Sequence, residues 1–273
     1  MRPLALALGL IGFAGGAFAA DLPFPPLAHE PIAYVPGFPS YFPWQGFYAG
    51  GQLTGADANA NFTSATEPLL ALALRNSILE DQQRISNVQV LGAAESRAAG
   101  VGGFAGYNWQ FENAIIGLEF SYTHTNSLTV TAPVFPINRL TPPLSNGSAY
   151  DVILTGSGTM LIHDFGTLRA RFGWVAGSFM PYATIGVAAA RADLAVSVTC
   201  NCVQQTPPAN ISFTQSEAKN DAFLLGYAGG GGVDIALTRN LFARAEYEYL
   251  QFSPVWSITS HIHTAHVGLG LKF

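Results

Sequence analysis

The charged residues of this sequence fall at alternate positions within short apolar segments. Arg169 and Arg171 are separated by a single alanine. In a later segment, Arg244, Glu246 and Glu248 alternate with uncharged residues. Successive side chains of a β-strand point to opposite faces, so both segments predict strands with one charged face and one apolar face. Acids and bases gathered on one face of a sheet can form ion pairs or line a pathway for ions.

The same alternation places a balanced set of charges on one face of the predicted sheet. The set consists of four acids and four bases: Glu119, Asp234, Glu246, Glu248, Arg169, Arg171, Arg244 and Lys272. If the apolar faces meet lipid, a charge turned toward the bilayer midplane costs about 2–4 kcal/mol, so the charges must point inward. Buried charges are tolerated when they are paired. The set therefore favours an ion-pair network that plugs a lumen, and an ion pathway or gate is the alternative.

Two cysteines and four histidines could also bind or react. Cys200 and Cys202 are the only cysteines, and in an oxidising envelope we expect a local disulfide or pairing with another molecule. Structural zinc normally takes four ligands, so no metal site is predicted there. The histidines flank two loops at one rim: His124, His163, His261 and His263. Haem or another ligand bound at these loops is a less favoured interpretation, because rim histidines are usually just solvated.

An enzyme is not predicted. Ser260, His261 and Glu248 have the side chains of a nucleophile, a base and an orienting group. However, Ser260 and His261 are adjacent, and adjacent residues of a strand point to opposite faces. We therefore assign no catalytic residues and no cofactor.

Among the strands that must position these functional residues, the one at the end of the chain has the clearest sequence pattern. Its alternate positions are apolar, and the residues between them are Thr, His, Gly or Lys; the apolar set is Ala265, Val267, Leu269, Leu271 and Phe273. This pattern is typical of the closing strand of a transmembrane β-barrel. We expect it to act as the signal that the barrel-assembly machinery binds.

Period-two alternation predicts eight strands in all. They lie near Gly46–Thr54, Gly100–Gln110, Ala114–His124, Phe165–Trp174, Pro181–Arg191, Ala222–Ile235, Leu241–Leu250 and Ile262–Phe273. Three connections are short, whereas the others are mostly long: Gly55–Ala99, Thr125–Asp164, Ala192–Asp221 and Gln251–His261. Short turns at one end and long loops at the other predict an eight-stranded antiparallel transmembrane up-and-down barrel with long extracellular loops.

Aromatic residues and overall composition agree with a membrane setting. Eight aromatic residues fall toward strand ends, where girdles meet lipid headgroups: Tyr48, Tyr107, Trp109, Tyr122, Trp174, Tyr182, Tyr247 and Tyr249. Only 11% of the residues are charged, whereas about 25% is usual for soluble domains. The net charge of −5 argues against nucleic acid as a partner, and outer-membrane lipid is the partner expected instead.

Three segments divide the chain. Residues 1–19 have one early positive charge, an apolar stretch and an A-x-A site, which predicts a signal peptide. Residues 20–43 are rich in proline and predict an extended periplasmic arm. Residues 44–273 form the predicted barrel. Within its first long loop, Glu67–Asp81 predicts a helix with Pro68 in the first turn, which either packs on neighbouring loops or presents an apolar patch or lid.

Several short motifs together resemble a known family. They are Trp44–Gly51, Gly106–Gln110, Gly117–Glu119, Leu168–Gly173 with Pro181-Tyr182, and the Lys272-Phe273 ending. In this order and spacing the sequence resembles the small porin-like outer-membrane proteins with an OmpA-type eight-stranded barrel. The resemblance implies an outer-membrane location, surface antigenicity and a role in envelope integrity, with permeability or haem binding in some members. The expected function is therefore a structural or surface-interaction role, with loops that meet an extracellular ligand or host surface, and a small porin is the alternative.

Overall fold

The computed structural model describes residues 42–205 and 208–273. The predicted signal peptide and nearly all of the proline-rich arm lie outside the described residues. Within the described part of the chain, no helix is long and apolar enough to cross a bilayer. The strands are β1 Gly46–Asn61, β2 Ala93–Phe111, β3 Ala114–Thr131, β4 Ile137–Leu140, β5 Tyr150–Trp174, β6 Phe179–Gln204, β7 Ala209–Ala236, β8 Leu241–Val255 and β9 Ile258–Lys272.

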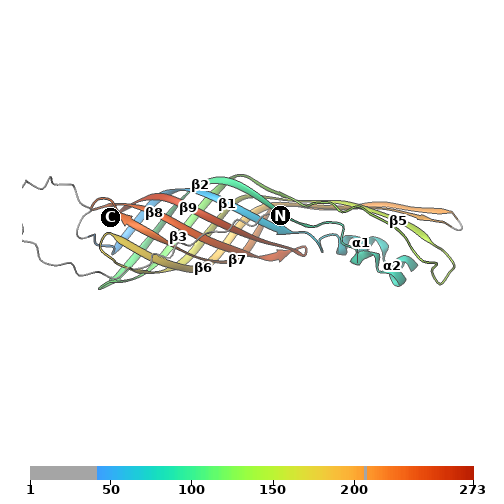
Figure 1. Ribbon diagram of the computed structural model, residues 1–273, viewed down its shortest axis with the longest axis horizontal. Coiled ribbons are helices and arrows are strands. Elements are labelled where there is room, and N and C mark those ends of the chain that lie inside the picture. The colour runs from blue at the N-terminus through green and yellow to red at the C-terminus, as the bar shows by residue number, and fades with distance from the viewer. Residues whose placement is uncertain (1–41, 206–207) are drawn as a thin grey trace, which may run out of the picture. The chain divides into compact units, whose positions relative to one another are not determined.

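Eight of these strands close into a ring. They pair side by side in the order β3, β2, β1, β9, β8, β7, β6, β5, and β3 pairs with β5 to complete the barrel (Figure 1). Neighbouring strands of the ring all run antiparallel to each other. The predicted eight-stranded up-and-down barrel is confirmed. The sequence did not predict β4, a short ninth strand that pairs with β5 beyond the ring.

The connections between strands agree with the prediction at one end of the barrel and depart from it at the other end. At the end that we call the base, strands are joined by the short turns 112–113, 175–178 and 237–240. At the opposite end, which we call the mouth, only the connections 62–92 and 132–149 are long. The predicted long loops Ala192–Asp221 and Gln251–His261 are wrong. Most of their residues continue β6, β7, β8 and β9 as paired strand, and β5 likewise extends past the barrel (Figure 1).

Bulges explain why the sequence interpretation ended several strands too early. In β3 the residues that point inward are odd-numbered up to Thr125 and even-numbered from Leu128, because the register shifts between His124 and Leu128. Ser127 lies within this bulge and has a φ of 58°. A similar shift occurs in β5 between Ile162 and Asp164. Another occurs in β7 between Lys219 and Ala222, where β7 pairs with Leu194 and Ala192 of β6. An extra residue exchanges the two faces of a strand, so a search for one unbroken alternation stops there.

The first long connection contains two helices where one was predicted. They are α1, Glu67–Leu74, and α2, Ile78–Gln83, separated by Asn76 in the left-handed region with a φ of 64°. Pro68 lies in the first turn of α1, as expected. Ser77 caps α2, because its hydroxyl accepts a hydrogen bond from the backbone N–H of Glu80 at 3.1 Å.

The outer wall of the barrel carries an apolar band. Its large side chains are exposed, and they include Phe47, Leu53, Val101, Trp109, Ile116, Leu118, Phe120, Leu168, Phe172, Ile185, Val187, Phe223, Leu225, Val267, Leu269 and Leu271. Such a surface matches the hydrocarbon region of a bilayer and would be unfavourable in water.

Candidate functional site in the barrel interior

Aromatic side chains fill the barrel interior at the base. Phe42 and Trp44 precede β1, and their tilted rings lie against each other with their centres 4.4 Å apart. Phe242 of β8 lies against Trp44, with ring centres 6.0 Å apart. These rings belong to a cluster that is almost completely buried: Phe42, Trp44, Tyr48, Phe104, Ile115, Met180, Tyr182, Ala236 and Phe242. We call this cluster the aromatic layer, and it fills the lumen next to the short turns.

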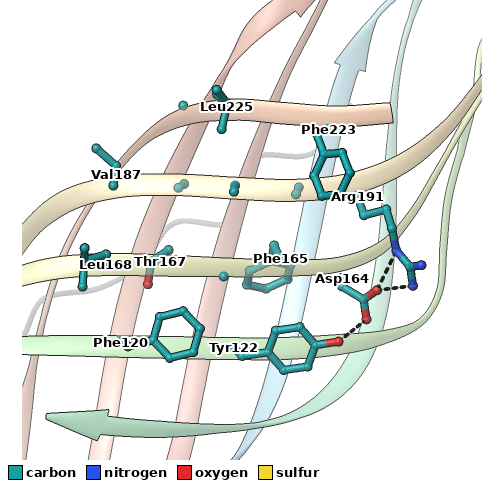
Figure 2. Close-up of a pocket in the computed structure, with 15 residues that line it drawn as sticks. Phe120, Tyr122, Asp164, Phe165, Thr167, Leu168, Val187, Arg191, Phe223 and Leu225 are labelled. Carbon is teal, nitrogen blue, oxygen red and sulfur yellow. Dashed lines mark hydrogen bonds and ion pairs between the residues drawn. The ribbon is translucent and has the colours of Figure 1, made fainter. Parts of the chain in front are cut away.

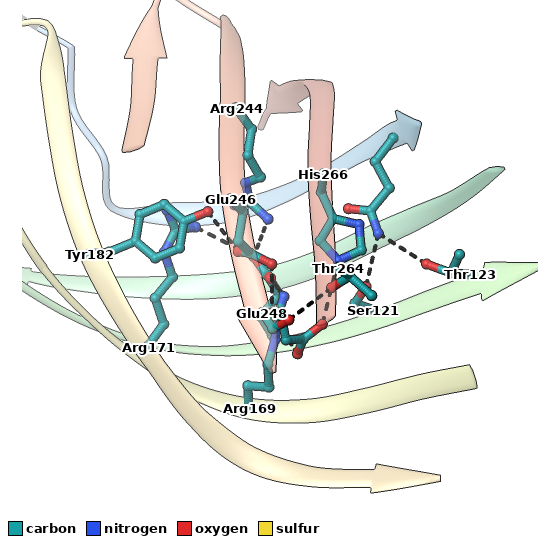
Figure 3. Close-up of polar contacts among 12 residues, drawn as sticks. Ser121, Thr123, Arg169, Arg171, Tyr182, Arg244, Glu246, Glu248, Thr264 and His266 are labelled. Atoms are coloured by element: carbon teal, nitrogen blue, oxygen red, sulfur yellow. Dashed lines mark hydrogen bonds and ion pairs between the residues drawn. The ribbon is translucent and has the colours of Figure 1, made fainter. Parts of the chain in front are cut away.

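Above the aromatic layer lies a network of buried charges, which we call the ionic layer. It contains seven of the eight charges that the sequence predicts to point inward, none more than 5% exposed: Glu119, Arg169, Arg171, Asp234, Arg244, Glu246 and Glu248. Arg169 pairs with three of its acids. Its guanidinium donates to Glu119 at 2.5 Å. It also donates to Glu246 at 2.7 Å and to Glu248 at 2.8 Å (Figure 3).

Arg171 and Arg244 share the remaining acids. Arg244 donates to Glu119 at 2.7 Å and to Asp234 through Nε at 2.9 Å. Arg171 donates to Asp234 and, at 3.4 Å, to Glu119. Glu119 therefore contacts all three arginines. Such a buried network requires every charge to be paired, because removing one partner leaves another charge desolvated and unpaired.

Two tyrosines that the sequence interpretation assigned to the aromatic girdles belong to the interior instead. The Tyr48 hydroxyl donates to Glu119 at 2.8 Å. The Tyr182 hydroxyl donates to Glu246 at 2.7 Å (Figure 3). Each tyrosine lies directly across from a glycine of the neighbouring strand, Gly106 or Gly232. A Cβ atom at either glycine would come within 3.0 Å of the tyrosine hydroxyl oxygen. The missing side chains thus make room for rings that hold the carboxylates.

Lys272 does not join the ionic layer. It lies near the end of β9 at the base, where its ammonium is 5.9 Å from the centre of the Phe42 ring, and it forms no ion pair with a described residue. His266, which lies six residues before Lys272 on the same face of β9, was not predicted. Its Nε2 is 3.5 Å from Glu248, and its ring nitrogens also lie 2.8 Å from the Thr54 hydroxyl and 2.9 Å from the Thr264 hydroxyl. His266 alternates with the outward apolar residues of β9, and this alternation is the signal in the sequence that could have identified it as an inward residue.

Glu246, Glu248 and His266 are also the described residues that come closest to a metal-ligand set. One ligand atom from each lies within 4.8 Å of the others. However, both glutamates bind Arg169, and both nitrogens of His266 contact threonine hydroxyls. These contacts already occupy the groups that a metal ion would need, so the three residues are explained as part of the ionic layer.

The interior at the mouth is apolar, and we call this region the apolar layer. Leu70 and Leu74 of α1 and Leu79 of α2 are buried there. They pack in one cluster with inward residues of the extended strands, which include Leu128, Val130, Leu154, Met160, Ile162, Leu194, Val196 and Val198. The predicted helix segment therefore packs on its neighbours, and among its leucines only Leu72, 60% exposed, points away.

Cys200 and Cys202 lie within this apolar layer and not in a loop, because β6 continues through them. They are joined by a disulfide and are completely buried. Two residues at i and i+2 of a strand share a face, so both point into the core.

The four rim histidines are separated into two groups. His124 of β3 contacts Asp164 at 2.6 Å, and His163 of β5 contacts Asp193 at 2.9 Å. The backbone N–H of Asp221 and the ring of His163 hold the pKa of Asp193 below the usual carboxyl range. His261 and His263 lie on β9, with β1 and β2 between them and β3 in the ring. Ser260 is buried inside the barrel whereas His261 is partly exposed, so they do not form a nucleophile and base pair.

The outer wall also has an apolar groove of about 670 Å³. Phe120 and Tyr122 stand on one side and Phe223 and Leu225 on the other (Figure 2). At one end, the Arg191 guanidinium donates to Asp164 at 2.6 Å. The predicted assembly signal likewise lies on the outer wall, where Val267, Leu269, Leu271 and Phe273 are each more than half exposed.

Comparison with known proteins agrees with this architecture. Residues 40–273 match the family model of the outer membrane protein beta-barrel domain. A 31 kDa outer-membrane immunogenic protein of Brucella melitensis is 27% identical over 286 residues, covering 100% of both chains. A 25 kDa outer-membrane immunogenic protein of Brucella ovis is 32% identical over 108 residues, covering 40% of this chain and 42% of that protein.

Among solved structures, the similar chains have low sequence identity and low TM-scores. The attachment invasion locus protein of Yersinia pestis is 12% identical, with a TM-score of 0.36, covering 84% of this chain and 99% of that chain. Neisserial surface protein A is 15% identical, with a TM-score of 0.36, covering 84% of this chain and 97% of that chain.

Proposed function

This chain belongs to the outer membrane protein beta-barrel domain family and is located in the outer membrane, and on that premise we propose that it is a closed barrel with a structural and surface-interaction role. The interior serves to hold the wall together. The strands and helices beyond the mouth serve to meet molecules outside the cell.

The observation that carries the closed-barrel proposal is the continuous filling of the lumen. The aromatic layer fills the base, the ionic layer fills the middle, and the apolar layer fills the mouth. An eight-stranded barrel is only wide enough for side chains to fill it. Residues from each of these three layers are almost fully buried. This supports a lumen that is closed by all three layers and not by the ion pairs alone.

The mouth end supports the surface-interaction role. β5, β6 and β7 are 25, 26 and 28 residues long, whereas a membrane-crossing strand needs about 9–11 residues. Much of the outer half of β7 is exposed and polar, including Glu217 and Lys219. Relatives of this chain are outer-membrane immunogenic proteins, which is consistent with exposure of the corresponding region to the outside.

We propose two partners for the outer wall. The apolar band and the groove beside Phe223 fit the hydrocarbon chains of outer-membrane lipid. The exposed alternate side chains of β9 fit recognition by the barrel-assembly machinery.

Replacing Phe273 with Ser should lower the amount of folded barrel recovered from outer membranes, whereas Phe42→Ser should leave assembly recognition intact and affect stability only.

A small porin that lets small solutes diffuse is the alternative function, and haem or ligand binding by the loops is less favoured. A porin needs a continuous aqueous path, which the three filled layers oppose. A haem site that used all four rim histidines is disfavoured, because His124 and His163 each contact a carboxylate away from β9.

The deciding experiment is single-channel conductance of folded protein in planar bilayers, with folding verified by the gel-mobility shift on boiling. Wild type should be silent. Because the apolar layer remains in place, Arg169→Ala with Arg171→Ala should raise conductance little. Combining these changes with a shortened 62–92 connection should open a measurable current. A steady conductance from folded wild type would overturn the closed-barrel proposal and establish the small porin.

A further inference from the structure

Two histidines on the outer wall of β9 lie side by side without a role in the closed barrel. His261 and His263 are partly exposed residues at positions i and i+2, so they share the outward face of the strand. Their ring centres are 5.5 Å apart and the ring planes are inclined by 86°. Both histidines are nearer to the mouth than Ala265. The outward side chains of β9 change there from apolar to polar, so the histidines face water outside the membrane.

The nitrogens of these rings are available in the way that a metal site requires. His263 Nδ1 is hydrogen-bonded to the Tyr247 hydroxyl at 2.5 Å. A hydrogen bond at one ring nitrogen fixes the orientation of the imidazole and leaves the other nitrogen for a metal. His261 makes no hydrogen bond or ion pair with a described residue. The Tyr249 ring lies beside both histidines, with its centre 5.0 Å from His263 and 5.8 Å from His261.

The separation of the rings matches simple coordination geometry. A tetrahedral ion bound about 2.1 Å from each nitrogen would hold two imidazole centres about 5 Å apart. The observed 5.5 Å requires only a small side-chain adjustment. We propose that His261 and His263 form a surface binding site for a divalent transition-metal ion.

The surrounding charges favour a cation. Across the strand pairs, His263 faces Asp57 and His261 faces Asn59 of β1, and these face Arg97 and Glu95 of β2. Arg97 is paired with Asp57 at 2.7 Å, which leaves Glu95 as the unbalanced charge of this patch. Because the Asp57 carboxylate is already paired with Arg97, water molecules can complete the coordination. Imidazole ligands suit Cu²⁺, Ni²⁺ and Zn²⁺, and Cu²⁺ should bind more tightly than Zn²⁺.

The other histidines of the barrel provide matched controls. His124 is also an outward rim residue, but its Nδ1 contacts Asp164 at 2.6 Å and no second histidine stands beside it on β3. His124→Asn therefore removes one exposed histidine without touching the pair on β9. Because all of these positions lie on the outer wall, the proposal does not rest on whether the lumen conducts.

The test is calorimetric titration of untagged, folded protein in detergent with Zn²⁺ and, separately, Cu²⁺. Wild type should bind one ion. Two linked ligands bind more tightly than one, so His261→Asn and His263→Asn should each weaken binding by about a hundredfold, and His124→Asn should leave it unchanged. Equal affinity in wild type and both β9 variants would overturn the proposal, as would loss of binding in His124→Asn alone.

A spectroscopic readout separates ligation from a general effect on folding. The electron paramagnetic resonance spectrum of bound Cu²⁺ should show coupling to two imidazole nitrogens in wild type and to one in His261→Asn. Tyr247→Phe should keep both nitrogens but weaken binding by about tenfold and move its pH dependence, because Tyr247 acts as a positioning residue. A wild-type spectrum without imidazole coupling would count against the site.

Discussion

The ionic layer and the apolar layer occupy the interior of one barrel, yet their chemistry is opposite. Glu119 of β3 points inward between Leu118 and Phe120, which face outward and are about half exposed. Further along the same strand, Leu128 and Val130 point inward and Thr129 points outward. The strand is inside-out where lipid surrounds it, and it has the ordinary arrangement where water surrounds it.

This difference indicates that the solvent outside the wall decides what the interior can contain. In the membrane, apolar residues are needed on the outer face, and hydrogen bonds and ion pairs can hold the inner face together. Beyond the membrane, only inward apolar burial gives a hydrophobic driving force. The bulges in β3, β5 and β7 lie where one arrangement replaces the other.

The strongest way to break the ionic layer is Arg169→Met. The substitution leaves Glu246 and Glu248 without their guanidinium partner, and loss of one member of a buried ion pair costs about 3–5 kcal/mol. Urea unfolding in micelles should reveal the loss as a lower free energy of unfolding. Arg97→Met, which removes an exposed pair with Asp57, should change it by less than about 1 kcal/mol. Equal effects of the two substitutions would contradict a buried network.

The apolar layer should respond to Leu70→Ala with a smaller and more local loss. Leu70 is fully buried, and truncation of such a residue costs about 2–5 kcal/mol, here at the lower end because the 62–92 connection can relax. Limited proteolysis should cut within that connection before the barrel unfolds. Leu72→Ala on the same helix is the control, since Leu72 is 60% exposed and should change stability by about 0.5 kcal/mol or less. Identical proteolysis of both variants would argue against a packed mouth.

The contact between the aromatic layer and the ionic layer can be tested at Gly232. A Cβ atom there would lie 2.8 Å from the Tyr182 hydroxyl oxygen and 2.5 Å from the Ala245 carbonyl oxygen. Gly232→Ala should therefore displace Tyr182 from Glu246 and cost about 1–3 kcal/mol, measured by the same unfolding experiment. Gly229→Ala is the matched control, because its nearest neighbour would be at an ordinary 3.8 Å. A larger loss for Gly229→Ala would show that the tyrosine contact is not the cause.

The smallest effect concerns pH at the water-exposed end. The pKa of Asp193 is lowered in the folded protein, so its stabilisation is present above the unfolded value of about 3.9 and is lost as pH falls through the lower folded value. The stability difference between wild type and Asp193→Asn should shrink as the pH falls below about 4. Unfolding measured across this range would contradict the assignment if the difference grew on acidification.

The sequence predicted much of the fold because alternation is a local property. The apolar positions of Ala114–His124 and Phe165–Trp174 were enough to give two strands of the barrel wall and to turn Glu119, Arg169 and Arg171 inward. It failed where alternation is interrupted. The bulge at Ser127 and the left-handed Asp221, with a φ of 51°, exchange faces and made paired strand look like loop.

The sequence by itself determined the number of barrel strands, the lipid-facing side and which charges point inward, since each depends on residues only a few positions apart. The tertiary structure alone decided the partners. Arg244 meets Glu119 across 125 positions of sequence, Tyr48 and Tyr182 enter the interior beside glycines, and Lys272 stays at the base. Those contacts depend on strand register and on closure of the ring, which bring distant segments together and cannot be deduced from the period of any single strand.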